Sequence, residues 1–146
     1  MISDIQKLRE ATGAGMMDCK RALDSAKGDY AVALEFIRTQ GLAKAEKKSD
    51  RATGAGVLES YIHGGRIGVL LEMRCETDFV ARGDLFKTLA HDIAVHVSAM
   101  NPSTVDELLL QPYVRDESTT VGDLVKGIIA KTGENARIER FARFEL

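Results

Sequence analysis

Two short stretches, residues 12–23 and 75–82, carry side chains whose types and spacing suit the recognition of another protein. In the first stretch, Met17 and Lys20 are three positions apart, so a helix would place them on one face, one turn from each other. A flexible thioether beside a long cation makes an adaptable contact surface. The alternative interpretation is an ordinary helix with one surface lysine and one spare methionine.

The second stretch combines a helix-capping signal with an aromatic residue. Thr77 can cap a short helix that begins at Asp78, directly after a strand-like segment. Phe79 follows at once, so we expect its side chain near the helix start, where an aromatic ring can anchor in a pocket of a partner. In the alternative interpretation Asp78 stabilises the helix N-terminus and Phe79 belongs to the core.

Chemistry that makes or breaks bonds has little support in the sequence. A hydrolase or transferase needs a nucleophile with a base, paired carboxylates or a metal, and none of these sets occurs at a recognisable spacing. Without a CxxC, an HExxH or a Cys/His cluster, we expect no metal ligands and no catalytic residues. The glycine clusters in residues 12–15 and 53–56 do not fit a phosphate loop, so we expect no cofactor. A small enzyme that uses Cys75 or His63 stays as an alternative, and it requires a reactive thiol or a titrating histidine in a cleft.

Composition limits the partners and the compartment. The 146 residues are 45% hydrophobic and 29% charged, with a net charge of −2, which disfavours binding to nucleic acid. Since the sequence has no long apolar segment and no secretory signal at its start, we expect a cytoplasmic protein that does not enter a membrane. Cys19 and Cys75, far apart in the sequence, are expected to be reduced and buried.

Helical periodicity predicts three short helices with small residues at their contacts over residues 1–42. Residues 43–55 are rich in Ala and Lys and indicate a basic, partly helical linker. The third helix is expected to end at Gly41. The expected inward positions are Met16, Cys19 and Leu23 in the second helix and Val32, Ala33, Phe36 and Ile37 in the third.

The remaining residues, 56–146, predict a mixed unit. The Gly64-Gly65 pair indicates a tight hairpin between two strands, and residues 84–100 form a clear amphipathic helix pattern. A second helix is expected between a capping box at Thr120 and Asp123 and a C-cap at Gly133. The fold class is therefore α+β: a three-helix bundle, a linker, and a three-stranded antiparallel sheet covered by helices. In the last strand the same face is expected for Ile138, Ala142, Phe144 and Leu146.

The two recognition stretches also carry a family resemblance. Residues 12–23 resemble the N-terminal signature of elongation factor Ts, and residues 75–82 resemble its Thr-Asp-Phe-Val signature. The resemblance implies a ubiquitin-associated-like helical domain (1–42), a basic linker (43–55) and an α+β core and dimerisation domain (56–146). It continues along nearly the whole chain, in Ser60–Leu70, Met100–Pro102, Ala130–Asn135 and Arg140–Glu145.

The resemblance implies a guanine-nucleotide exchange factor that binds elongation factor Tu, in its GDP-bound and nucleotide-free forms, and speeds GDP release. Asp78 and Phe79 match the pair that intrudes near the partner's switch region and disturbs its magnesium and phosphate site, and Thr77 and Val80 flank them in the same segment. Such a factor forms and breaks no covalent bonds. The resemblance also implies that Lys20, Met16 and Met17 dock on the partner's nucleotide-binding domain. It implies secondary contacts by Lys48, His63, Thr132 and Gly133.

The sequence also departs from the longer members of that family. Only Ser103–Leu110 joins two proline-containing segments where many members carry a helical hairpin, and the core subdomain is not duplicated. We therefore expect a homodimer through the core sheet. Thr132 stands where many members have a larger apolar residue, which would weaken that contact.

A second class of function remains open: a plain binding module, in which the helical domain docks through residues 16–20 without any effect on bound nucleotide.

Overall fold

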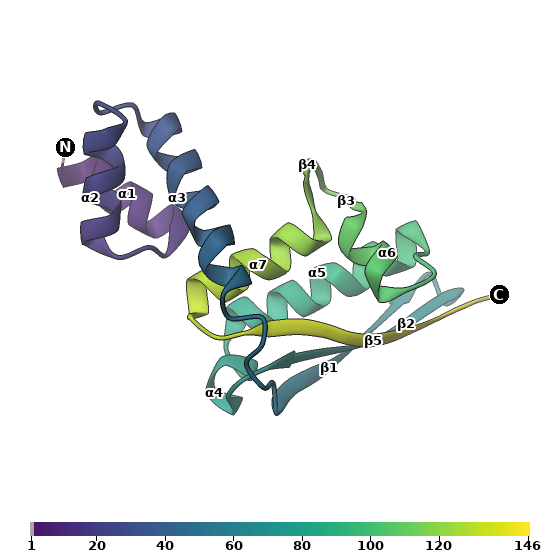
Figure 1. The fold of residues 1–146 in the computed structure, drawn as a ribbon. Helices are drawn as coiled ribbons and strands as arrows, with labels where there is room; N and C mark the ends of the chain where they lie inside the picture. The colour runs from purple at the N-terminus through teal and green to yellow at the C-terminus, as the bar shows by residue number, and fades with distance from the viewer. Residues whose placement is uncertain (1) are drawn as a thin grey trace.

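The computed structural model describes residues 2–146, and its first part is a small helical bundle (Figure 1). The bundle consists of α1 (Ile2–Thr12), α2 (Met16–Ser25) and α3 (Tyr30–Glu46). The side chain of Asp29 caps α3 by accepting a hydrogen bond from the Val32 amide at 3.1 Å. The small core of the bundle contains Leu8, Cys19, Ala22, Leu23, Ala33 and Ile37.

Two expectations for the bundle were wrong. Met16 is exposed on α2, where Cys19, Ala22 and Leu23 are the buried residues. Val32 and Phe36 are exposed on α3, because the side of this helix that faces the bundle core carries Ala33 and Ile37. The helix also continues through Gly41 to Glu46, inside the segment predicted as a linker. A Cβ at position 41 would stand 3.2 Å from the Cβ of Ala130, so this glycine allows two helices to pack closely rather than ending one.

The three-stranded sheet has the order β1-β2-β5, with both neighbouring pairs antiparallel. Strands β1 (Ala55–His63) and β2 (Ile67–Cys75) form the predicted hairpin, in which Gly64 and Gly65 adopt φ values of 57° and 68°. Strand β5 (Ala136–Glu145) lies on the other side of β2. The central strand is the most buried of the three, as its apolar run predicts.

Helices cover one face of this sheet. Helix α4 (Asp78–Ala81) follows β2, and α5 (Asp84–Met100) and α7 (Val121–Thr132) lie side by side above the strands (Figure 1). Between them come α6 (Val105–Leu110) and a small hairpin of β3 (Pro112–Tyr113) and β4 (Asp116–Thr120). Of these, the hairpin was not predicted from the sequence. The capping box of Thr120 with Asp123 and the left-handed Gly133 confirm the expected ends of α7. The core between the layers includes Leu71, Met73, Phe86, Ile93, Val97, Leu108 and Val121.

A β-bulge corrects the expected faces of the last strand. Glu72 pairs with Arg140 and Met73 with Ile138, so Glu139 is an extra residue in β5. The extra residue reverses the alternation, so Phe144 points away from the core that buries Ile138. Arg143 takes the inward direction instead and donates to the Ser98 carbonyl, near the end of α5, at 3.0 Å.

His96 is a fully buried polar residue of α5 with both ring nitrogens in use. Nδ1 accepts a hydrogen bond from the Val114 amide at 3.1 Å, so Nε2 carries the proton and donates to Gln111 at 2.9 Å. The ring also stacks on Tyr113, with centroids 5.8 Å apart. His96 therefore fixes the residues around β3 against α5. Burial lowers the pKa of His96, against an opposing effect of the Gln111 hydrogen bond.

We expect the stability of the core to fall as the pH drops below about 6.5, the ordinary pKa of histidine. The unfolded chain gains a proton at His96 there, while the folded chain resists it, so protonation favours unfolding. Urea unfolding measured between pH 5 and pH 8 checks this, with a His96→Gln variant as the control. An equal pH dependence in both proteins would contradict the assignment to His96.

Candidate partner-binding site

The tip of α4 presents an aromatic side chain to solvent. Thr77 Oγ1 accepts a hydrogen bond from the Val80 amide at 3.4 Å, which confirms the predicted cap. Phe79 is 89% exposed, so the interpretation of Phe79 as a core residue is wrong. Ala81, two residues on, is buried and attaches the short helix to the core. The sequence thus places one large apolar ring on a capped helical turn, where its exposure to water is unfavourable in free energy.

Cys75, beneath this tip, has the environment of an inert thiol. Its side chain is fully buried, and Sγ donates to the Thr77 carbonyl at 3.2 Å. Burial, followed by the negative charge of Glu134, raises the pKa of Cys75 above that of a free thiol. A thiol that resists deprotonation is a poor nucleophile.

His63 lies at the other end of the hairpin. The strand register pairs Ala55 with Cys75 and His63 with Ile67, so the lengths of β1 and β2 separate Cys75 from His63. At the usual rise per strand residue this separation is about 25 Å. The structure therefore does not bring His63 to the α4 tip, and these two residues cannot act together as a nucleophile and base.

The end of α7 gathers three of the predicted contact residues. Gly133 adopts the left-handed conformation, and Thr132 Oγ1 donates back to the Ile128 carbonyl at 2.8 Å. A Cβ at Gly133 would stand 3.9 Å from Lys48 Nζ, so Lys48 and Gly133 are close neighbours. The structure thus brings Lys48 next to Thr132 and Gly133, which lie in a distant part of the sequence.

Glu134 joins this cluster to the α4 tip. One carboxylate oxygen accepts the Thr77 amide at 2.9 Å and the other accepts the Thr77 hydroxyl at 2.7 Å. Asn135, which is buried, donates from its side chain to the carbonyls of Ser49 and Arg51 at 3.2 and 2.7 Å. Sequence reasoning missed these two roles, because neither residue has a local pattern that indicates a partner so far along the chain.

The docking residues predicted on the bundle form a separate surface. Met16, Met17 and Lys20 are exposed on α2. The loop before α2 approaches the same end of α7, since a Cβ at Gly13 would stand 3.2 Å from Lys131 Cγ. The last turn of α7 therefore contacts the bundle and continues directly into the segment that holds the α4 tip.

Residues 2–146 contain no group of three or more His, Cys, Asp or Glu side chains that could hold a metal ion. The helices of the same range are also too short or too polar to cross a bilayer.

An exposed aromatic ring on a capped turn and an exposed Met–Lys helix face are surfaces that suit the binding of another protein. Comparison with known proteins identifies the kind of protein. Residues 76–146 match the profile of the family described as Elongation factor TS. The chain belongs to the elongation factor Ts family, a family of translation elongation factors.

Relatives support this assignment along nearly the whole chain. Elongation factor Ts of Thermotoga neapolitana is 42% identical over 186 residues, covering 97% of this chain and 94% of the relative. That alignment is longer than the chain itself, so the relative has segments without a counterpart here. Elongation factor Ts of Nostoc sp. is 48% identical over 143 residues, covering 97% of this chain but 45% of the relative. The chain thus spans less than half of the Nostoc protein.

Proposed function

We propose that this protein binds elongation factor Tu and accelerates the release of its GDP. The observation that carries the proposal is the 89% exposed Phe79 on a capped, anchored turn, within the Thr-Asp-Phe-Val segment that resembles the family's signature. In the free protein, exposure of this apolar ring to water is unfavourable in free energy. The ring gains packing contacts only when a partner receives it in a pocket.

The proposed mechanism is a difference in binding affinity and requires no covalent step. Phe79 enters the region beside the partner's magnesium and phosphate site, and its insertion is incompatible with an ordered site. The factor then binds nucleotide-free elongation factor Tu more tightly than the GDP form. By linkage, GDP weakens the binding of the factor by the same ratio. The protein is therefore an exchange factor rather than an enzyme.

The remaining predicted contacts have a place in this arrangement. Lys20, with Met16 and Met17, would dock the bundle on the partner's nucleotide-binding domain, while Asp78 begins the helix that carries Phe79. Lys48, Thr132 and Gly133 would form a secondary contact beside the tip. His63, at the far end of the sheet, would contact a different part of the partner or none.

The direct test is the release of fluorescent GDP from elongation factor Tu, chased with excess GDP, at increasing concentrations of this protein. We expect the rate to rise with the concentration and then to saturate. Binding without any acceleration would replace the exchange function with that of a plain docking module.

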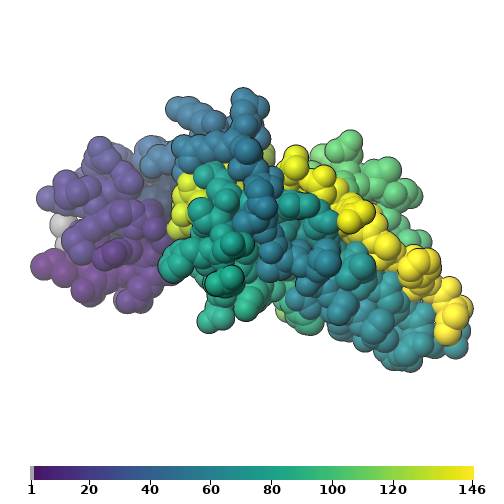
Figure 2. Space-filling model, turned by 90° about the horizontal axis from the view of Figure 1, so that it is seen from below, coloured from purple at the N-terminus to yellow at the C-terminus, as the bar shows by residue number. Residues whose placement is uncertain are grey.

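We also propose that two copies associate through the outer face of the sheet. Figure 2 views the molecule from the sheet side, and helices leave this face uncovered in the described part of the chain. Leu58 and Ile62 are each 65% exposed there and Phe144 is 78% exposed. In the register, Leu70 lies opposite Ala142, and Phe144 lies opposite Gly68, so apolar groups from all three strands meet on one face.

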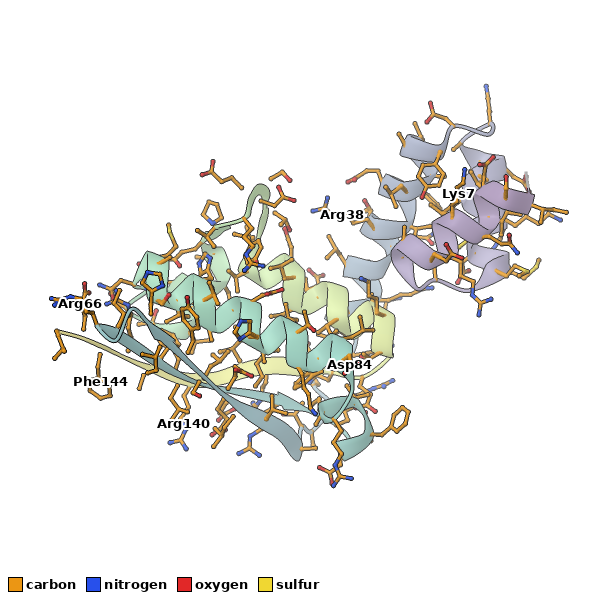
Figure 3. The ribbon with its side chains drawn as sticks, turned by 180° about the vertical axis from the view of Figure 1, so that it is seen from behind. Lys7, Arg38, Arg66, Asp84, Arg140 and Phe144 are labelled. Atoms are coloured by element: carbon orange, nitrogen blue, oxygen red, sulfur yellow. The ribbon has the colours of Figure 1, made fainter. Side chains whose placement is uncertain are left out.

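A second copy is the occupant that best suits this surface. Figure 3 shows Phe144 and Arg140 projecting from β5 away from the helices. Arg140 pairs with Glu72 at 3.0 Å, which leaves the apolar part of the face flanked by neutralised charge. A self-complementary apolar face with balanced charges at its edge favours a two-fold dimer. The longer members of the family, which duplicate the core, would make a similar contact within one chain.

Replacing Leu70 with Lys should weaken this dimer at least about tenfold, because the charge would be buried without a partner at the centre of the face. Sedimentation velocity over a range of micromolar concentrations measures the change. The matched control is Leu110→Lys, which adds the same charge at an exposed leucine of α6, outside the sheet. A monomeric wild-type chain across that range would contradict the dimer.

A further inference from the structure

Glu134 makes a two-point contact with the residue that begins the exposed tip. Its carboxylate accepts both hydrogen-bond donors of Thr77, the amide at 2.9 Å and the hydroxyl at 2.7 Å. The two residues are 57 positions apart in the sequence, so the contact joins the end of α7 to the start of α4. A charged acceptor makes such hydrogen bonds shorter and about twice as strong as neutral ones.

The tip depends on such an external contact because α4 is only four residues long. One helical turn is too short to be stable by its own hydrogen bonds. Ala81 fixes the C-terminal side of the turn in the core, while Phe79 makes almost no contact with the rest of the chain. The N-terminal side is held at Thr77, whose amide and hydroxyl donate to Glu134 and whose carbonyl accepts from the Cys75 thiol.

The Thr77 hydroxyl bonds both to Glu134 and to the Val80 amide of α4. A threonine hydroxyl has one proton and two acceptor lone pairs. Since its proton is donated to Glu134, the lone pairs of Thr77 Oγ1 remain available for the Val80 amide, which donates at 3.4 Å. The carboxylate therefore fixes the rotamer of Thr77 in the orientation that caps the turn carrying Phe79.

We propose that Glu134 is a positioning residue for nucleotide release: by holding Thr77 it fixes the direction of Phe79 relative to the surface of Lys48, Thr132 and Gly133. The proposal rests on the proposed exchange function. It assigns Glu134 no contact with the nucleotide. A pre-organised tip inserts without first losing conformational freedom, which lowers the cost of the productive complex.

We expect the loss of Glu134 to lower the maximal rate of GDP release rather than the affinity with which the factor docks. Glu134→Ala should lower the GDP-release rate at saturating factor about three- to tenfold, while the concentration for half-saturation changes less than twofold. Glu134→Gln should recover part of the rate, since its one carbonyl oxygen can accept one of the two Thr77 donors. The matched control is Glu139→Ala, which removes a carboxylate of β5 that pairs with the exposed Arg137.

A double-mutant cycle with Phe79→Ala separates positioning from general destabilisation. If Glu134 acts through Phe79, its removal should have no further effect on release once the ring is absent. An equal loss in both backgrounds, a release rate of Glu134→Ala equal to that of the wild type, or a change in half-saturation alone would overturn the proposal.

Amide hydrogen exchange tests the positioning independently of any nucleotide assay. The amides of Thr77 and Val80 should exchange faster in Glu134→Ala than in the wild type or in Glu139→Ala. Unchanged exchange at Thr77 would overturn the positioning role, whatever the release assay gives. Failure of the wild-type chain to accelerate release would instead overturn the proposed function, and with it the role of Glu134 in release.

Discussion

Replacing Phe79 with Ala is expected to slow factor-stimulated GDP release from elongation factor Tu at least about tenfold. An aromatic ring that enters a partner's pocket is commonly worth about 2 kcal/mol, and each 1.4 kcal/mol corresponds to a factor of ten. The fold should be unaffected, because a side chain that is 89% exposed contributes little to the core. Saturating stopped-flow traces with fluorescent GDP give the rate, and thermal unfolding shows whether the fold is intact.

The control for this prediction is another exposed apolar residue. Leu110→Ala truncates a side chain of α6 that is 78% exposed, and it should leave the release rate unchanged. Both variants should stay within about 0.5 kcal/mol of the wild type in stability, as is usual for surface substitutions. If Phe79→Ala releases GDP as fast as the wild type while its melting temperature is unchanged, Phe79 is not the residue that disturbs the partner's nucleotide site.

Local signals account for the parts of the fold that the sequence predicted well. The Gly64-Gly65 turn, the capping box at Thr120 and the cap at Thr77 each require interactions within about four residues. Patterns of that length are complete in the sequence, and the physical constraint acts on the same residues that carry the pattern. The hairpin and the start and end of α7 follow directly.

Faces and registers were harder to predict, because they depend on packing partners. Glu139 looks like an ordinary residue of an alternating strand, yet as the extra residue of the bulge it reverses every later side chain of β5. Similarly, Gly41 has the residue type of a C-cap, but α3 continues because the glycine lets it approach Ala130 of α7. In both cases a contact far along the chain outweighs the local preference.

The candidate site shows the same division. The cap at Thr77 was predictable from four consecutive residues, whereas the same residues left open whether Phe79 is exposed or belongs to the core. The connection of Thr77 to Glu134 was not predictable, since no periodicity or spacing relates positions 57 apart. Family motifs named both segments without saying how they meet. The structure supplies that relation, and it turns two separate motifs into one surface.

The largest expected loss of stability follows from Gly56→Ala. Gly56 lies in β1 opposite Arg74 of the central strand. A Cβ there would overlap the Met73 carbonyl oxygen and stand 3.1 Å from the Arg74 Cα. Both are backbone atoms of β2, which pairs on its other side with β5, so they cannot move without disturbing the whole sheet. We expect a loss on the order of 3 kcal/mol or more, in the range of strain and overpacking.

Gly54→Ala provides the matched control, two residues earlier in the same stretch. A Cβ at Gly54 meets no atom of residues 2–146 within 4 Å, so this variant should be neutral or slightly more stable. Urea unfolding of both variants measures the difference, which should be at least about a hundredfold in the folding equilibrium. The two glycines look equivalent in the sequence, where both suggest a boundary between units. Equal stability of the two variants would show that β1 does not approach β2 as closely as the register requires, and the antiparallel pairing at that end of the hairpin would then be wrong.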